Sequence, residues 1–306
     1  MGARDDNSGR EPIAAAMRSK LLETPVGPGL HVVSTPIGNL ADISLRALAT
    51  LGAADLILCE DTRVTAKLKS AFSIGAPLSA YHDHNAAKVL PGIIKTLEEG
   101  KIVALVSDAG TPTISDPGYR LINAAREADI SVTAVPGASA VLTALAASGL
   151  PTDRFFFAGF PPQKEAARRK ALSSLAEIPA TLVFYESPNR LAASLAAMAE
   201  ILGPRRAVIA RELTKRHEEI RRGDLAALAA ETAEAPPPKG EIVILTGPPE
   251  APDAPGPAET DALLRAALET RTVRDAAAEI AAQTGLKRRD LYNRALALKD
   301  GDGGNG

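Results

Sequence analysis

Short apolar runs alternate with helix-forming stretches from residue 30 onward. The runs predict strands at 30–34, 55–60, 101–107 and 131–135, and the stretches between them, rich in Ala, Leu, Lys and Glu, predict helices. Nearly continuous apolar runs are typical of strands that a sheet buries on both faces. The alternation therefore predicts a first α/β domain at 30–149.

A second series of strands follows a break at 149–152, where glycine and proline interrupt the pattern. Its apolar runs lie at 155–160, 181–187, 206–212 and 241–247, and Ala-rich helical stretches separate them. This pattern predicts a second α/β or α+β domain at 150–247, and we expect α/β.

The two ends of the chain lack this alternation. Residues 1–29 carry charges throughout and have no apolar signal-peptide core, so a disordered leader is expected there. Five prolines after Gly247 predict an extended linker at 248–259. A helix, a short glycine-containing turn and a second helix predict a helix-turn-helix-like module at 260–299, before a disordered tail at 300–306.

Composition narrows the class of protein. With 306 residues, 45% hydrophobic and 24% charged, the chain is typical of a globular protein of about two domains. Its single cysteine excludes an internal disulfide. The net charge of −2 gives no general affinity for nucleic acid, so any such surface is a local patch. No apolar run approaches the roughly 20 residues of a membrane span, and a cytoplasmic location is expected.

Three loops rich in proline and glycine follow predicted strands of the first domain. They read STPIGNLADIS at 34–44, SDAGTPTISDPG at 107–118 and VPGASA at 135–140. Ligands of parallel sheets bind beyond the carboxyl ends of the strands, so three such loops indicate a ligand site on one rim. The loops lack the glycine patterns of dinucleotide and P-loop sites, so neither NAD nor ATP is favoured.

Acidic residues at strand ends are the candidate catalytic groups. Asp108, Glu60, Asp61 and Glu186 each close a predicted strand, and the residues alone do not choose a base among them. Asp61 is equally suited to capping the next helix. The sequence His82-Asp83-His84 has metal-ligand types but no cysteine partner, so no metal site is predicted.

In order, the motifs TPIGNLADIS, CEDTR, SDAGTPTISDPG, PGASA, GLPTDRFFFAGF, FYESPNR, ARELTK and KGEIVILTG resemble the ribosomal RNA small subunit methyltransferase I family, a branch of the tetrapyrrole methylases. The resemblance spans about residues 30–298. It implies two α/β domains of tetrapyrrole-methylase type, with a cofactor cleft between them and a small C-terminal helical module. It also implies a homodimer that uses S-adenosylmethionine to methylate the ribose 2′-hydroxyl of a decoding-centre cytidine in 16S rRNA, either free or in the assembled small subunit.

The same resemblance implies a set of cofactor contacts: Ile37, Ala109, Gly110, Thr111, Ile114, Ser139, Ala140, Glu186 and Leu213. Thr111 stands where tetrapyrrole enzymes carry an acidic residue, which weakens the case for a tetrapyrrole substrate. As the general base we favour Asp108, because it adjoins the loop assigned to the cofactor.

Local clusters of basic residues are the candidate RNA contacts. Hypothesised phosphate contacts are Arg63, Lys164, Arg168, Arg169, Lys287, Arg288 and Arg289. Two alternatives stay open on sequence: a tetrapyrrole-precursor methyltransferase, and a non-catalytic protein that binds nucleic acid and senses S-adenosylmethionine or assists ribosome assembly. The basic C-terminal module argues against the first alternative, and the absence of an obvious set of base-reading side chains argues against a DNA-binding sensor.

Overall fold

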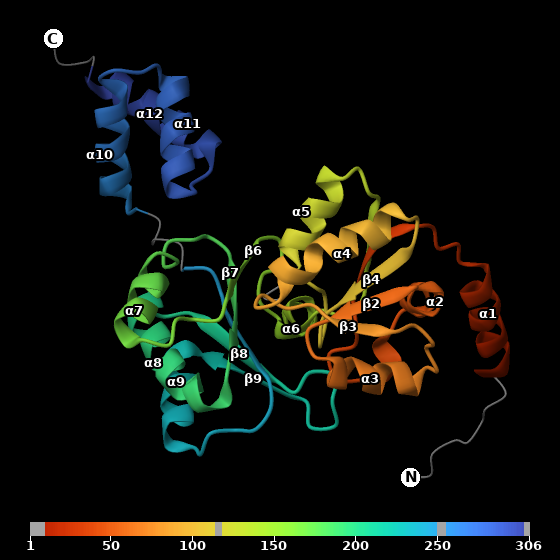
Figure 1. Ribbon diagram of the computed structural model, residues 1–306. Helices are drawn as coiled ribbons and strands as arrows, with labels where there is room; N and C mark the ends of the chain where they lie inside the picture. The colour runs from red at the N-terminus through yellow and green to blue at the C-terminus, as the bar shows by residue number, and fades with distance from the viewer. Residues whose placement is uncertain (1–9, 114–117, 250–254, 303–306) are drawn as a thin grey trace. The chain divides into compact units, whose positions relative to one another are not determined.

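A computed structural model describes residues 10–113, 118–249 and 255–302 (Figure 1). The chain up to Pro249 forms one compact unit and the remainder a second. Within these described ranges, the first unit contains two five-stranded sheets and the second contains three helices. The predicted α/β class with a C-terminal helical region is confirmed.

The first sheet is parallel throughout, with strand order β3-β2-β4-β1-β5. Its strands are β1 (Gly29–Val33), β2 (Leu56–Cys59), β3 (Leu78–Ala80), β4 (Ile102–Val106) and β5 (Val132–Val135). Its helices are η1 (Leu40–Asp42), α2 (Leu45–Ala53), α3 (Thr62–Ala71), α4 (Ala86–Glu98), α5 (Tyr119–Glu127) and α6 (Ala140–Ser148). The short, half-buried β3 has no continuous apolar run, and the sequence pattern did not predict it.

Side-chain caps fix where these helices begin. Ser44 accepts a hydrogen bond from the Ala47 amide at 3.1 Å, and Ser139 accepts one from the Leu142 amide at 3.5 Å. Gly149 ends α6 in the left-handed conformation, at φ 78°. Because the loops before α2 and α6 are anchored at these caps, they hold a defined position above the sheet.

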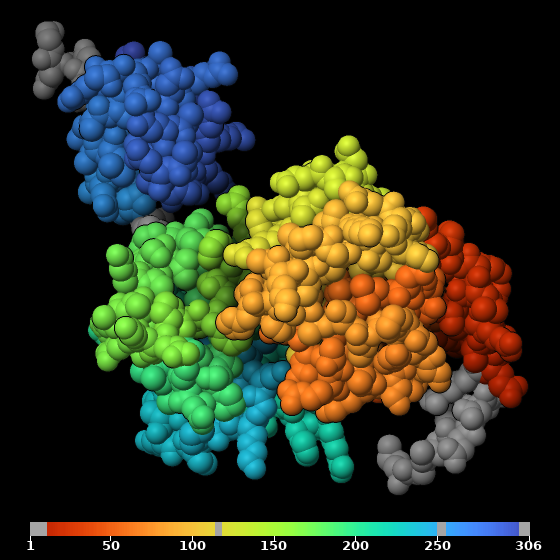
Figure 2. Space-filling model, in the orientation of Figure 1, coloured from red at the N-terminus to blue at the C-terminus, as the bar shows by residue number. Residues whose placement is uncertain are grey.

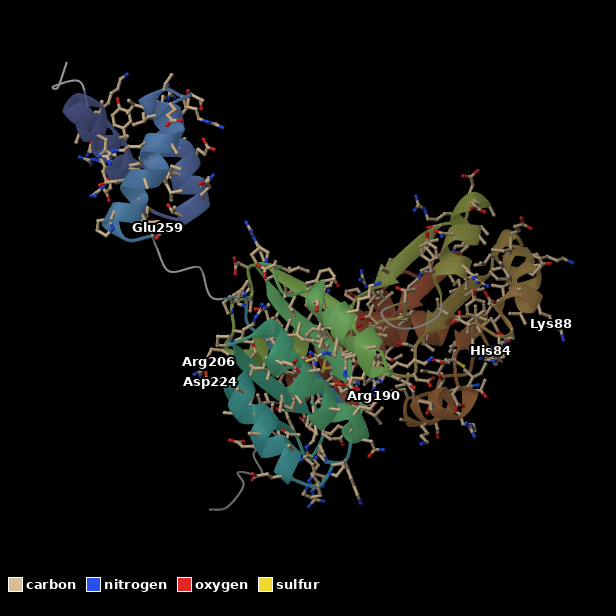
Figure 3. The ribbon with its side chains drawn as sticks, turned by 90° about the vertical axis from the view of Figure 1, so that its left-hand side faces the viewer. His84, Lys88, Arg190, Arg206, Asp224 and Glu259 are labelled. Carbon is tan, nitrogen blue, oxygen red and sulfur yellow. The ribbon has the colours of Figure 1, made fainter. Side chains whose placement is uncertain are left out.

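The second sheet has strand order β6-β7-β10-β8-β9 and is mainly antiparallel, only β6 and β7 being parallel. Its strands are β6 (Phe155–Gly159), β7 (Thr181–Glu186), β8 (Arg206–Arg211), β9 (Glu219–Asp224) and β10 (Ile242–Thr246). Its helices are α7 (Glu165–Ser173), η2 (Pro188–Arg190), α8 (Leu191–Leu202) and α9 (Leu225–Glu234). The polar edge strand β9 was not predicted; it pairs with β8, and Arg206 and Asp224 form a salt bridge of 3.7 Å across the pair (Figure 3).

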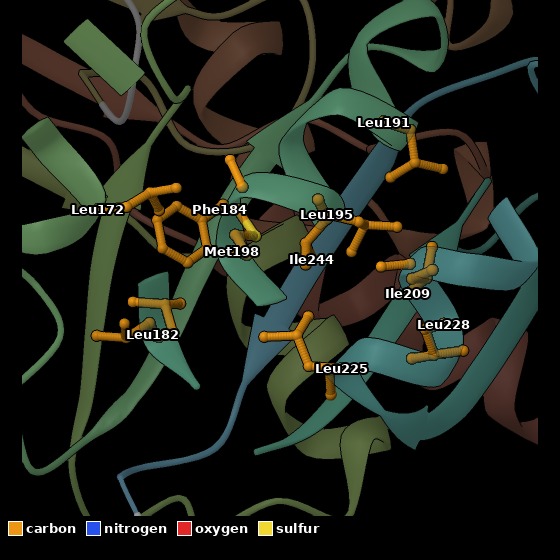
Figure 4. Close-up of a cluster of buried hydrophobic side chains, with 14 of the residues drawn as sticks. Leu172, Leu182, Phe184, Leu191, Leu195, Met198, Ile209, Leu225, Leu228 and Ile244 are labelled. Carbon is orange, nitrogen blue, oxygen red and sulfur yellow. The ribbon is translucent and has the colours of Figure 1, made fainter. Parts of the chain in front are cut away.

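A dense apolar cluster holds the helices of the second domain on this sheet (Figure 4). Phe184 on β7 and Ile244 on β10 lie under Leu195 and Met198 of α8, all of them at most 2% exposed. In the first domain, Cys59 lies fully buried at the end of β2, and burial raises the pKa of its thiol. The lone thiol is therefore part of the core.

The N-terminal prediction of a disordered leader at 1–29 is wrong for most of that range. Helix α1 (Arg10–Glu23) packs beside α2 (Figure 1), and Gly29 already belongs to β1; residues 1–9 lie outside the described part of the chain. Ala and Leu in α1 have high helix propensity, which outweighed its low apolar content. Among the described helices, none has the length and apolar character that a bilayer crossing requires.

The C-terminal unit consists of α10 (Pro257–Leu268), α11 (Val273–Thr284) and α12 (Arg288–Asp302). Leu264, Ile280 and Leu291 form its buried centre. Helix α10 begins at Pro257, inside the predicted linker, because proline suits the first turn of a helix. Helix α12 continues through Asp302, into the predicted tail, and residues 250–254 and 303–306 lie outside the description.

Candidate active site

The three proline-and-glycine loops of the first domain converge, as the sequence predicted. Thr35 and Gly110 form a two-bond bridge between the first and second loops, with N···O distances of 2.8 and 3.1 Å. The Thr111 hydroxyl lies 3.0 Å from that of Ser34 and donates to the Ala138 carbonyl at 3.4 Å. These bonds join all three loops at the ends of β1, β4 and β5, which are neighbours in the sheet.

A cavity of about 400 Å³ opens beside these loops and reaches the second domain. In Figure 2 the first α/β domain (orange) and the second (green) lie next to each other within this one compact unit. Ten predicted site residues line the cavity: Ile37, Glu60, Asp108, Ala109, Gly110, Thr111, Ser139, Ala140, Glu186 and Leu213. The predicted contact Ile114 lies outside the described residues.

The second domain supplies a wall that the sequence pattern did not predict. Its residues are Phe160, Tyr185, Ser187, Pro188, Ala210, Gly240, Glu241, Ile242 and Val243. The ring of Tyr185 packs edge-to-face on those of Phe157 and Phe160, with centroids 4.9 and 5.4 Å apart. Burial, together with the charge of Glu241, raises the pKa of Tyr185, so its hydroxyl stays protonated at neutral pH. The aromatic part of the wall is thus uncharged.

The donor set of this cavity fits S-adenosylmethionine. Apolar and aromatic side chains suit the adenine ring, and the backbone of the Ala109–Thr111 segment offers polar groups. Glu60 and Asp108 also line the cavity, and neither forms an ion pair within the described chain. Two carboxylates without an ion-pair partner at this cavity suit a ligand that carries sulfonium and ammonium charges.

Glu186 has little freedom to contact a ligand through its carboxylate. One oxygen accepts from the Ser187 amide at 2.8 Å and lies 3.4 Å from Nε of Arg190, which Figure 3 labels; the other accepts from the Ser194 hydroxyl. The side chain is fully buried. Any contact that Glu186 makes with a ligand is therefore a backbone contact, and the carboxylate is not available as a base.

Asp61 is a helix cap and does not line the cavity. Its carboxylate accepts from the Arg63 amide at 2.8 Å and pairs with the Arg63 guanidinium at 2.6 Å. These hydrogen bonds lower the pKa of Asp61 to about 2. The prediction that Asp61 is catalytic is therefore not supported, and the hypothesised phosphate contact Arg63 is already paired. The Asp61 amide donates to Asp108 at 3.0 Å, which fixes one Asp108 oxygen.

Two of the arginines in the predicted basic cluster of α7 already have hydrogen-bond partners within the protein. Arg168 is only 7% exposed and donates to the Gln163 carbonyl, so its prediction as a phosphate contact is wrong. Arg169 forms a two-bond ion pair with Glu200. Lys164 is exposed, as are Lys287, Arg288 and Arg289 at the start of α12.

The loop between β8 and β9 brings a charged cluster to the same region. Lys215 donates to Glu212 at 2.7 Å and to Glu241 at 2.9 Å. The backbone of Glu212 has a φ of 51°. A Cβ on Gly240 would lie 2.4 Å from the Glu212 side chain, so only glycine fits at position 240. Burial alone would lower the pKa of Lys215, but the hydrogen bonds to Glu212 and Glu241 raise it overall.

This cluster predicts an acid-sensitive contribution to stability. The hydrogen bond from Lys215 lowers the pKa of Glu212, so the contribution is complete above the ordinary glutamate value of 4.5 and is lost as pH falls through the lowered value. Glu212→Gln should therefore lower the unfolding temperature at about pH 7, and this effect should shrink at an acidic pH below the lowered pKa of Glu212. Thermal unfolding measured across this range tests it, with Glu127→Gln at the end of α5 as control; an equal deficit at both pH values would contradict it.

The fold and the cleft between the two domains define the class. The family model for tetrapyrrole (corrin/porphyrin) methylases matches residues 29–229. Diphthine synthase is similar in structure, with a TM-score of 0.57 and 15% identity over 71% of this chain and 89% of that one. The cobalt precorrin-4 methyltransferase CbiF has a TM-score of 0.54 and 19% identity over 71% and 94%. These likenesses show the tetrapyrrole-methylase fold.

Sequence relatives narrow the class to one branch. The ribosomal RNA small subunit methyltransferase I of Mesorhizobium japonicum is 53% identical over 94% of this chain and 99% of that protein. Its Escherichia coli O157:H7 counterpart is 47% identical over 87% and 94%. The model of the RsmI C-terminal HTH domain matches residues 254–299. The chain belongs to the ribosomal RNA small subunit methyltransferase I family, and it is a methyltransferase with S-adenosylmethionine as methyl donor.

Proposed function

We propose that this enzyme methylates the ribose 2′-hydroxyl of a decoding-centre cytidine in 16S rRNA. The observation that carries the proposal is the cavity at the ends of β1, β4 and β5, which fits S-adenosylmethionine, in a chain whose relatives are named for small-subunit rRNA methylation. The three-helix C-terminal unit, with exposed Lys287, Arg288 and Arg289, supports an RNA substrate.

The residues of the cavity have three tasks in this reaction. When bound beside Asp108 and the Ala109–Thr111 segment, S-adenosylmethionine would supply the methyl group for the 2′-oxygen, and its sulfur would keep the electron pair of the broken bond. The bridged loops hold the donor in place, and such positioning contributes about 7–11 kcal/mol in favourable cases. The wall around Tyr185 excludes water. Asp108 accepts the proton of the ribose hydroxyl.

Methyl transfer to defined RNA substrates tests the proposal. Small subunits that lack the modification, and free 16S rRNA in parallel, are incubated with labelled S-adenosylmethionine, digested to nucleosides and analysed by mass. We expect 2′-O-methylcytidine as the labelled product. Label in another nucleoside would reject the cytidine target, and cofactor binding without any transfer to either RNA would favour a small-molecule substrate or a sensor.

The C-terminal basic residues should contribute electrostatic affinity for RNA. Replacing Lys287, Arg288 and Arg289 together by Ala should weaken RNA binding and reduce the salt dependence of log K by about 0.7 for each phosphate that the protein no longer neutralises. Titration at several salt concentrations measures both quantities. The matched control is Lys69→Ala on α3, and an unchanged salt slope in the triple variant would remove this module from RNA recognition.

We further propose that the enzyme is a cytoplasmic homodimer. The aromatic side chains of Phe155 and Phe156 on the edge strand β6 are 44% and 42% exposed, and a second copy of the chain would cover such a surface. Sedimentation at micromolar concentration should give twice the chain mass of 31.7 kDa. A monomer at all concentrations would reject the dimer without affecting the proposed reaction.

A further inference from the structure

A second cavity, of about 430 Å³, adjoins the first. Four residues line both cavities and form the boundary between them: Ile37, Asp108, Ala109 and Glu241. A direct transfer between two bound molecules requires two sites that share a boundary, with the reacting atoms about 3–3.5 Å apart. Asp108 is the one candidate base among the described residues that lines both cavities.

Besides Glu241 and the loop after β4, which contributes Ser107, Asp108 and Ala109, three segments form the walls of the second cavity. The loop after β1 contributes Pro36, Gly38 and Leu40; one face of α3 contributes Val64, Lys67 and Leu68; and Lys215 closes the side formed by the β8–β9 loop. A Cβ on Gly38 would lie 2.4 Å from Cγ of Lys215, so the Lys215 side chain rests directly on the loop.

Two apolar side chains of this cavity are unusually open to solvent. Leu40 is 47% exposed and Val64 is 37% exposed. Both lie at the cavity that the catalytic candidate Asp108 also lines. An extruded nucleoside would cover these side chains with the flat face of its base, a common way to hold a nucleotide outside its helix.

Lys67 supplies an available positive charge at the same cavity. It is exposed and forms no hydrogen bond or ion pair with any residue that the structure describes. By contrast, Lys215 is paired with Glu212 and Glu241. A nucleotide in RNA carries a phosphate beside its ribose, and Lys67 is the cation available to bind it among the described residues that line this cavity.

We propose that this second cavity receives the nucleotide that is methylated. Its nucleoside packs on Leu40 and Val64, its 2′-hydroxyl faces Asp108, and its phosphate contacts Lys67. The inference rests on the proposed RNA-methylating function. It places the nucleotide that accepts the methyl group in a cavity separate from that of the cofactor.

Two substitutions on α3, each with a neighbour as control, test this assignment. Val64→Trp fills the cavity and Lys67→Ala removes the cation; Ala66→Trp and Lys69→Ala change residues of the same helix that do not line it. We expect Val64→Trp to lower methyl transfer by at least about tenfold and Lys67→Ala to raise KM for the small subunit by about tenfold. Binding of S-adenosylhomocysteine, measured by calorimetry, should stay within about twofold of the wild type in all four variants.

The outcomes separate the two proposals. Wild-type kcat and KM in both cavity variants would overturn the acceptor pocket and leave the RNA-methylating function intact. An equal loss in the two control variants would also overturn it, because the effect would then belong to the helix. If Val64→Trp does not fold, Lys67→Ala and its rescue by Lys67→Arg decide the question. A wild-type protein that transfers no methyl group to RNA would overturn the function itself, and this inference with it.

Discussion

Asp108→Asn should lower the rate of methyl transfer by about 10²–10⁴-fold while cofactor binding stays close to that of the wild type. The amide oxygen of Asn keeps an acceptor for the Asp61 amide, so the loop at the end of β4 should hold its position. The side chain loses the ability to take the proton of the ribose hydroxyl. Single-turnover transfer to small subunits, with calorimetric binding of S-adenosylhomocysteine, measures the two effects separately.

Glu60→Gln is the matched comparison for this variant. Glu60 also lines the cofactor cavity, but it does not line the adjoining one. We therefore expect Glu60→Gln to change cofactor affinity more than the rate of transfer. The opposite pattern, a large rate loss in Glu60→Gln with near-normal turnover in Asp108→Asn, would make Glu60 the base.

Phe184→Ala should destabilise the folded α/β unit by about 3–5 kcal/mol. Phe184 is 2% exposed on β7, and its ring contributes to the cluster beneath α8 (Figure 4). Removing the ring leaves a cavity. Because β7 pairs with both β6 and β10, the backbone around this cavity cannot move freely to fill it. Urea unfolding measures the loss.

The control is another phenylalanine of the same sheet. Phe155 on the edge strand β6 is 44% exposed, so Phe155→Ala should cost about 1 kcal/mol or less. Similar destabilisation by both substitutions would contradict the assignment of Phe184 to the buried core of this domain.

The convergence of the three loops was predictable because parallel strands place their carboxyl ends on one edge. Ser34, Thr35, Asp108 and Gly110 follow strands that are neighbours in the sheet, and the sequence marked each with turn residues. The far wall was not predictable in the same way. Residues such as Tyr185 and Val243 meet through antiparallel register, which joins segments almost 60 residues apart and leaves no local pattern.

Charged residues were the least predictable part of the site, because their partners decide their role. Arg168 looked like part of a basic surface, yet Leu172 lies four residues later on the buried face of α7, and the two share that face. For Asp61 the sequence left catalysis and helix capping equally open, and Arg63 was hypothesised as a phosphate contact; the structure shows Asp61 as the cap of α3, paired with Arg63. The apolar spacing of α7 would have identified the first case; the second depends on side-chain geometry.

The burial of Cys59 makes the protein convenient for site-specific labelling. The chain has one cysteine, it is enclosed by the first sheet and its helices, and its raised thiol pKa keeps it in the unreactive protonated form. A maleimide dye would therefore react with a single introduced thiol, such as one at the exposed Asn293 of α12, without removal of the native cysteine. Fluorescence from that position would follow the arrival of RNA at the C-terminal helices while the catalytic cavities keep their natural composition.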